Sequence, residues 1–233
     1  MQETSVPLHR HPRPHRELWR RYRHYAAQQE FRVSILLAVS MFFGSVAVSF
    51  FAIRYATERA SSSVTDIVLS NIPAVDVDGI FVFSTVLLIV FVTLLLFAHP
   101  KRIPFVLHSL TTFYLIRSAF ISLTHIGPFP VEVQNADWGT FASRFLFSSD
   151  LFFSAHTGVP FLLALIFWKE RNLRNIFLAW SIFMGAVVLL GHYHYSIDVA
   201  SAFFITYTIY HLVRWLFPKD RALFYTQVPA EFL

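Results

Sequence analysis

The sequence predicts an all-α membrane protein, a bundle of six transmembrane helices, from three observations. Of its 233 residues 55% are hydrophobic and only 14% are charged, whereas soluble domains carry about 25% charged residues. The apolar residues fall in blocks of about 20, the length that crosses the roughly 30 Å hydrocarbon core as one helix. The Lys and Arg residues gather in alternate connections between these blocks. A soluble globule of this composition would expose a large apolar surface.

Six runs that are uncharged or nearly so are candidate membrane spans. The first follows about thirty mostly polar and basic residues, and it is long enough to remain a helix rather than serve as a cleaved signal peptide. The fifth run is the shortest, and a very short turn separates it from the sixth, so these two should form an antiparallel hairpin. The six runs cover residues 33–53, 79–98, 103–126, 151–168, 175–190 and 195–217.

The distribution of charge predicts the orientation. An even number of spans places both termini on one side, and most of the 19 Lys and Arg residues fall on that side, which is therefore expected to be cytoplasmic. The chain should comprise a basic cytoplasmic tail (1–30), a six-helix transmembrane domain (31–217) and a cytoplasmic C-terminal tail (218–233). Because the basic excess flanks apolar spans and not a soluble domain, it indicates a membrane partner and no nucleic acid.

The N-terminal tail has two interpretations. Its aromatic and leucine side chains fall near one helical face with arginines around them, as in an interfacial helix on anionic lipid. Alternatively, the segment is a disordered basic tail that only sets the topology. The side chains on this face are Leu18, Trp19, Tyr22 and Tyr25.

The absence of cysteine restricts the chemistry. With no Cys in the chain, disulfide scaffolds, cysteine-ligated zinc, iron–sulfur clusters and thiol nucleophiles are all excluded. We expect no cofactor.

Two polar clusters open the fourth and sixth predicted spans at the same face of the membrane. Ionisable groups within spans are costly, which favours a functional interpretation. His194 and Asp198 are four residues apart, so they can hydrogen-bond on one helical face, with the carboxylate orienting the imidazole. His156, from the other cluster, can act as a proton donor and acceptor. Two histidines and an aspartate at a bilayer interface suit chemistry on a lipid phosphate. The clusters comprise Asp150, Ser154, His156 and Thr157, and His192, His194, Tyr195 and Asp198.

These clusters resemble the paired signatures of a known family. The segment Ser-Ala-His-Thr at 154–157, preceded by Asp150, and the segment His-Tyr-Ser-Ile-Asp-Val at 194–199 are similar to those of the sphingomyelin synthase family, within the lipid phosphate phosphatase/phosphotransferase superfamily. The resemblance covers about residues 105–217 and includes Tyr-Leu-Ile-Arg at 114–117. Ala155 stands where the family usually has Gly, and two serines at 148–149 replace its Cys-Gly.

The resemblance implies a mechanism. His194 would be the nucleophile on phosphorus and Asp198 would orient it. His156 would protonate the departing diacylglycerol oxygen and later deprotonate an acceptor hydroxyl. The implied partners are a phospholipid donor and a ceramide-like lipid alcohol, the implied intermediate is a phosphohistidine, and the site would lie on the extracytoplasmic face.

Negative charge in the transition state requires donors or cations. The candidates for phosphate binding are Arg117, Arg144, Ser154 and Thr157. Arg117 lies within a span, where a guanidinium costs roughly 2.5–3.5 kcal/mol unless it meets an anion or water. It would otherwise be a buried partner of a carboxylate, and Arg144 would otherwise only extend to the interface beside a loop.

Three further residues are candidates for head-group binding or for supporting the catalytic groups. Asp150 would orient Arg144 or a choline-like cation, or would only cap a helix. Tyr195, with Tyr193, would contribute to a cage for a quaternary amine, or would anchor the interface. His192 would donate a hydrogen bond to the site, or would be an exposed residue of the turn.

Three other functions remain open from the sequence. A lipid phosphate phosphatase would use the same site with water as the acceptor. His156, His194 and Asp198 would alternatively form a two-histidine, one-carboxylate metal site. The last alternative is a non-enzymatic protein of membrane transport or assembly, although only seven glycines are available for the broken helices typical of transporters. The oligomeric state and the head group are not predicted.

Overall fold

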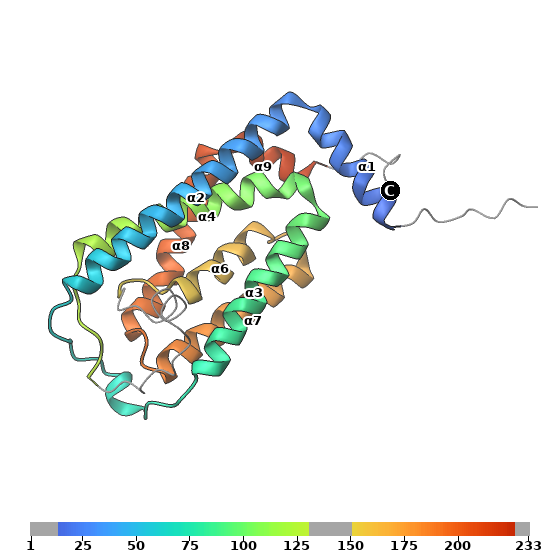
Figure 1. Ribbon diagram of the computed structural model, residues 1–233. Helices are drawn as coiled ribbons and strands as arrows, with labels where there is room; N and C mark the ends of the chain where they lie inside the picture. Colours follow the sequence, from blue (N-terminus) through green and yellow to red (C-terminus); the bar gives the residue numbers. More distant parts are fainter. Residues whose placement is uncertain (1–13, 131–150, 227–233) are drawn as a thin grey trace, which may run out of the picture.

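The structure is a computed structural model that describes residues 14–130 and 151–226 (Figure 1). Its regular elements are all helical and the described residues contain no strand, which confirms the all-α class. Two short 3-10 turns, η1 (Leu69–Asn71) and η2 (Pro100–Arg102), accompany the helices. The helices are α1 (Pro14–Ala27), α2 (Gln29–Glu58), α3 (Asp78–Ala98), α4 (Ile103–Leu123), α6 (Ala155–Ile166), α7 (Arg171–Leu190), α8 (Ser196–Leu216) and α9 (Pro218–Tyr225).

Five of these helices, α2, α3, α4, α7 and α8, are long and apolar enough to cross a membrane. The sixth apolar helix, α6, has only 12 residues, which rise about 18 Å. The expected span 151–168 is therefore too long at both ends. The chain before α6 is not helical because Phe152 and Phe153 adopt positive φ angles of 121° and 24°.

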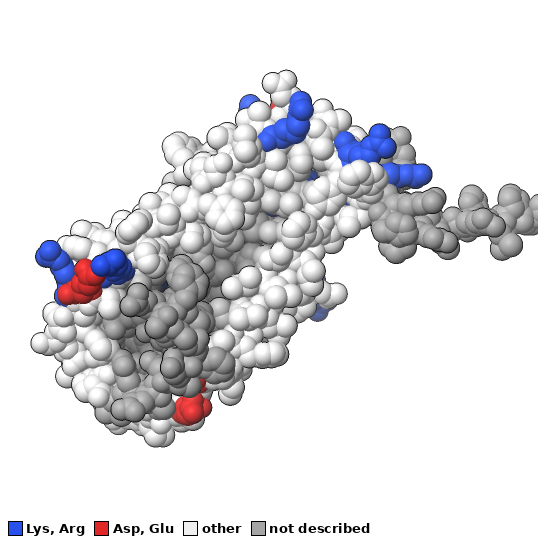
Figure 2. Space-filling model, in the orientation of Figure 1, with Lys and Arg blue, Asp and Glu red and all other residues white. Residues whose placement is uncertain are grey.

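The outer surface of the bundle is apolar. Figure 2 shows charged side chains gathered at the two ends of the molecule, with an uncharged surface between them. Large side chains on the outer faces of α2 and α3 are exposed, among them Leu36 and Phe43 at 67% and Phe83 at 68%. A surface of this kind is favourable in lipid and unfavourable in water. The apolar helices indicate an integral membrane protein.

Helix α6 forms the centre of the packing. It contacts α7 and α8 along most of its length, and α3 packs against α7 on the outside (Figure 1). A Cβ atom on Gly158 of α6 would lie 2.8 Å from ring carbons of Phe113 on α4 and 2.9 Å from Oγ1 of Thr206 on α8. The glycine therefore lets three helices approach closely. Helix α2 pairs with α4.

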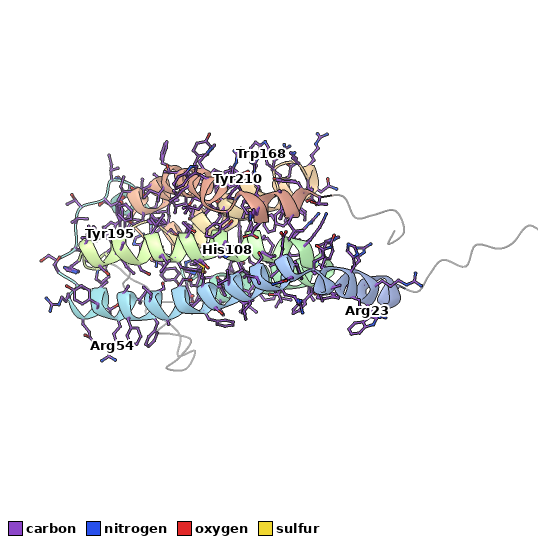
Figure 3. All side chains as sticks on the ribbon, turned by 90° about the horizontal axis from the view of Figure 1, so that it is seen from above. Arg23, Arg54, His108, Trp168, Tyr195 and Tyr210 are labelled. Carbon is purple, nitrogen blue, oxygen red and sulfur yellow. The ribbon has the colours of Figure 1, made fainter. Side chains whose placement is uncertain are left out.

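Successive spans alternate in direction, which defines two ends of the bundle. Helices α3, α6 and α8 begin at one end, which we name the site end, and α2, α4 and α7 begin at the other, which we name the basic end (Figure 1). Arg54 of α2 lies at the site end, and Arg23 of α1 lies at the basic end (Figure 3). The described residues of the two predicted polar clusters therefore lie at the same end of the bundle.

Two short helices cover the basic end. In α1 the Tyr22 hydroxyl donates to the Phe97 carbonyl at 3.0 Å, and Tyr25 is 4% exposed, while Trp19 is 66% exposed. The segment for which the sequence allowed either a helix or a disordered tail is thus helical, and Tyr22 and Tyr25 lie against the bundle. Part of the expected C-terminal tail forms α9, whose Tyr225 hydroxyl donates to the Ile166 carbonyl at 3.1 Å.

Candidate active site

The site begins at the first turn of α8. Oδ2 of Asp198 lies 3.1 Å from Nδ1 of His194 and accepts the backbone N–H of Tyr195, also at 3.1 Å. Asp198 is completely buried and His194 is 6% exposed. The pair expected from the i, i+4 spacing is present, but His194 lies in the turn before α8 and not on the helix, since α8 begins at Ser196. A carboxylate beside Nδ1 favours the tautomer protonated there, which leaves Nε2 with its lone pair.

The second histidine comes from α6. The ring centroids of His156 and His194 are 6.5 Å apart, with the planes inclined at 53°. The Phe81 ring of α3 lies 4.4 Å from the His156 ring and 5.1 Å from the Tyr193 ring. Helices α3 and α6 and the turn before α8 therefore bring two imidazoles close enough to act on one small group.

The segment before α6 is held to both neighbouring helices. Ser154 caps α6, with Oγ accepting the Thr157 N–H at 3.4 Å. The Ser154 N–H donates to the Asp198 carbonyl at 3.0 Å. Nε of Arg117, on α4, donates to the Phe153 carbonyl at 3.1 Å. The start of α6 is thus tied directly to the residue that orients His194.

Backbone strain is confined to the same region. Among the described residues, positive φ angles outside glycine occur at Phe152, Phe153 and His192. The two phenylalanines immediately precede the cap of α6, and His192 lies two residues before His194. Such conformations persist where the surrounding structure holds them, and they cluster at functional sites.

The three described candidates for phosphate binding are all buried. Arg117 is 3% exposed, and Ser154 and Thr157 are inaccessible. The Thr157 carbonyl accepts the Ser181 hydroxyl of α7 at 2.7 Å. Arg117 contacts the site at the segment before α6, because its Nε donates to the carbonyl of Phe153, the residue before Ser154. Arg144 and Asp150 lie outside the described residues.

His192 and Tyr195 are buried next to the site and contact the connecting segments. His192 is 3% exposed, with its ring against Phe129 at a centroid distance of 5.3 Å. Tyr195, which lies at the site end (Figure 3), is 1% exposed. Its hydroxyl donates to the Gly127 carbonyl at 2.9 Å and accepts the Val64 N–H at 3.1 Å. The Tyr195 side chain thereby joins α8 to two connecting segments.

Two acidic residues of the connection between α2 and α3 contact the site segments, although no sequence motif contains them. Asp66 accepts the N–H groups of Val68 and Leu69 through Oδ1 and the N–H of Ser196 through Oδ2, at 2.8, 3.1 and 2.7 Å. Asp78, at the start of α3, accepts the hydroxyl of Tyr193. Acidic residues in a connecting loop are common, so no sequence signal identified these partners.

The surroundings of Asp66 favour its charged form. Burial acts to raise the pKa of this carboxyl. The hydrogen bonds from the backbone of Leu69, Ser196 and Val68 together lower the pKa by more than burial raises it, so it lies below the ordinary value. The loop thus places a carboxylate at the N-terminus of α8, where the helix dipole also favours negative charge.

No group of three or more His, Asp or Glu side chains within residues 14–130 and 151–226 is arranged to hold a metal ion. The site contains an imidazole that is oriented by a carboxylate, and a second imidazole lies opposite it. These groups are suited to nucleophilic attack and proton transfer.

Comparison with known proteins supports this chemistry. Residues 148–216 match the family model described as the C-terminal part of the PAP2 superfamily. The matched segment contains α6, α7 and α8 and therefore both histidines. The match supports the lipid phosphate phosphatase/PAP2 superfamily and points to an enzyme that acts on the phosphate groups of lipids. It does not distinguish a sphingomyelin synthase-like subfamily. No curated protein and no solved structure matches the chain.

Proposed function

We propose that the protein is a sphingomyelin synthase-like phosphotransferase, which moves a phospho-head-group from a glycerophospholipid to a ceramide-like alcohol through a phosphohistidine. The observation that carries the proposal is the contact between His194 and Asp198 opposite His156, within the segment that matches the PAP2 superfamily.

In the first step, Nε2 of His194 attacks the phosphorus of the donor lipid. A nitrogen–phosphorus bond forms as the bond from phosphorus to the diacylglycerol oxygen breaks. His156, in its protonated form, gives its proton to that oxygen, and diacylglycerol leaves. Asp198 stabilises the positive charge on the His194 ring through Nδ1. Proton transfer of this kind contributes typically 10²–10⁴-fold in rate.

In the second step, the acceptor hydroxyl reverses the sequence. His156, now neutral, removes the hydroxyl proton while the oxygen attacks phosphorus, and the nitrogen–phosphorus bond breaks. His194 returns to its neutral form, and His156 is again protonated. In the phosphatase alternative the donor is a lipid phosphate and water replaces the lipid alcohol, so the same steps release inorganic phosphate.

Charge on the phosphoryl oxygens needs nearby donors. Arg117 supplies a guanidinium, and Ser154 and Thr157 supply the start of α6, where N–H groups and the helix dipole favour an anion. We assign Arg144 to the same clamp and Asp150, His192 and Tyr195 to head-group binding or support. The proposed location of this chemistry is the extracytoplasmic face.

The test is a transfer assay with purified protein in phosphatidylcholine nanodiscs that contain a head-group-labelled phospholipid. With ceramide present, we expect the label in a new lipid, and its appearance only as a water-soluble product would favour hydrolysis over transfer. Release of inorganic phosphate from a labelled lipid phosphate would favour the phosphatase. His194→Ala should remove both products. His211→Ala, a substitution of an exposed histidine on α8, should retain them.

Trapping of the intermediate gives an independent check. Acid-labile label on the protein, absent from His194→Ala, is expected during turnover. Full transfer by His194→Ala would overturn the nucleophile assignment, and full activity after exhaustive chelation would exclude the metal-site alternative.

A further inference from the structure

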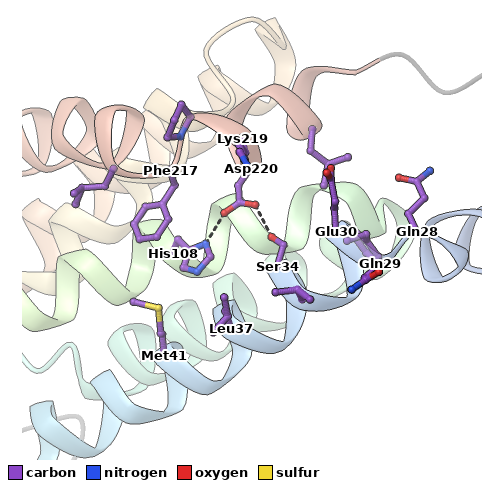
Figure 4. Close-up of a pocket in the computed structure, with 15 residues that line it drawn as sticks. Gln28, Gln29, Glu30, Ser34, Leu37, Met41, His108, Phe217, Lys219 and Asp220 are labelled. Atoms are coloured by element: carbon purple, nitrogen blue, oxygen red, sulfur yellow. Dashed lines mark hydrogen bonds and ion pairs between the residues drawn. The ribbon is translucent and has the colours of Figure 1, made fainter.

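A second buried polar cluster lies at the basic end of the bundle, at the opposite end from His194. It joins Ser34 of α2, His108 of α4 and Asp220 of α9 (Figure 4). Nδ1 of His108 lies 2.9 Å from Oδ2 of Asp220, and the Ser34 hydroxyl donates to Oδ1. His108 is 3% exposed and Asp220 is 9% exposed. Three helices from distant parts of the chain thus meet at one carboxylate.

The contacts around Asp220 determine the charge of this carboxyl group. Burial acts to raise the pKa of Asp220, but the contacts with His108 and Ser34 outweigh it, so the pKa lies below the ordinary value. Asp220 is therefore a carboxylate at neutral pH. A neutral His108 then carries its proton on Nδ1, which leaves Nε2 as an acceptor. The Phe217 ring stacks on this imidazole at 4.1 Å, with the planes 6° apart.

The cluster borders a cavity of about 900 Å³, within the roughly 300–1,000 Å³ range typical of small-molecule sites. Another part of its wall is apolar and includes Leu37, Met41 and Leu216. These three side chains are 52%, 39% and 45% exposed. The cavity therefore has a buried polar part and an apolar part that continues onto the outer surface of α2, which faces acyl chains in a bilayer.

Charge restricts the headgroup that such a cavity can accept. Its charged lining residues are Glu30, Lys219 and Asp220, and two carboxylates against one ammonium disfavour an anion. The basic residues around this end of the bundle disfavour a cationic headgroup. Nε2 of His108, the Ser34 oxygen and the carboxylates all accept hydrogen bonds. The complementary headgroup is uncharged and donates hydrogen bonds.

We propose that this cavity binds a neutral lipid alcohol of the acylglycerol class. Its hydroxyl groups would hydrogen-bond to the cluster of Ser34, His108 and Asp220, and its acyl chain would lie along Leu37 and Met41. This site is separate from the proposed phosphotransfer site, and the proposal does not depend on that activity.

The test is photo-crosslinking of the full chain in phosphatidylcholine nanodiscs with a monoacylglycerol that carries a diazirine and an alkyne in its acyl chain. We expect the label on peptides that contain Leu37 and Met41 or residues 216–223. Excess unlabelled monooleoylglycerol should reduce this labelling at least about five-fold more than oleic acid or oleylamine does, since each of these lacks the hydroxyl groups. Equal competition by the three lipids would overturn the proposal.

Variants locate the site. Met41→Trp fills the apolar part of the cavity and should reduce labelling about ten-fold. Phe43→Trp, on the same helix at a residue that is 67% exposed and does not line the cavity, should leave it unchanged. Unchanged labelling in Met41→Trp, in protein with wild-type thermal stability, would contradict this location. Failure here leaves the transfer assay unaffected, so the two proposals fail separately.

Discussion

The carboxylate of Asp66 accepts the backbone N–H of Ser196 at 2.7 Å, although the two residues are 130 positions apart. This contact attaches the connection between α2 and α3 to the first residue of α8, two residues after His194. The Tyr195 hydroxyl contacts the backbone of Val64 and Gly127 nearby. The segment that carries His194 is therefore held by connecting loops as well as by its own helix.

Asp66→Ala should destabilise the protein by about 1–3 kcal/mol, because three backbone N–H groups would lose a buried acceptor. Thermal unfolding in detergent measures the change. Glu58→Gln removes a negative charge from an exposed ion pair at the same end and should change stability by less than about 1 kcal/mol. A wild-type melting temperature for Asp66→Ala would contradict this role.

Acid stability should depend on the same residue. Because the pKa of Asp66 is lower in the folded protein than the ordinary value of 3.8, its stabilisation is fully present above that value and is lost as the pH falls through the folded pKa. Melting temperatures measured between pH 7 and pH 2 should therefore fall less steeply below about pH 4 in Asp66→Asn than in the wild type. Parallel curves would show that Asp66 does not contribute.

Asp198→Asn should reduce turnover roughly 10²–10⁴-fold, because an amide stabilises neither the required tautomer nor the positive charge on His194. The transfer assay on purified protein measures the loss. Asp76→Asn makes the same substitution at an exposed residue of the same end and should leave turnover unchanged. Equal turnover in the two variants would remove Asp198 from the mechanism.

Arg117→Lys should lose activity despite keeping the charge. A lysine cannot reproduce both the Nε contact with the Phe153 carbonyl and a planar guanidinium fork towards a phosphate. We expect at least about a ten-fold reduction in turnover, the effect of losing one charged hydrogen bond. An unchanged rate in the transfer assay would assign Arg117 a purely structural role.

Gly158→Ala should destabilise the bundle by about 1–3 kcal/mol through overpacking. The added Cβ would lie within 2.9 Å of the Phe113 ring and of Thr206 Oγ1, and both of these side chains are fully buried. Gly44→Ala, on α2, meets nothing within 4 Å and should be neutral or slightly stabilising. Equal thermal stability of the two variants would contradict the close packing of α6.

Secondary structure followed closely from hydropathy, because a membrane span must satisfy its own backbone hydrogen bonds as a helix. The expected spans 79–98 and 103–126 correspond to α3 and α4 with small shifts at their ends. The expected span 151–168 was less accurate. Its first four residues are as apolar as a helix requires, but contacts of Phe153 and Ser154 with Arg117 and Asp198 hold them in a different conformation.

The candidate site, too, could be predicted from the sequence only in part. The order of the chain and the alternation of spans were enough to bring His156 and His194 to one end, because short connections leave few alternatives. The contact between His194 and Asp198 was predicted from helical spacing, yet it forms across a turn. The role of Asp66 depends on a loop whose path local sequence does not specify.

The sequence by itself determined the helical class, the membrane environment and the group of residues at the site end, because composition and hydrophobic length act locally along the chain. Only the tertiary structure decided which side chains meet across helices, among them Asp66 with Ser196 and His108 with Asp220. Such contacts depend on the packing distances between helices, which small residues such as Gly158 allow and which no pattern within one segment encodes.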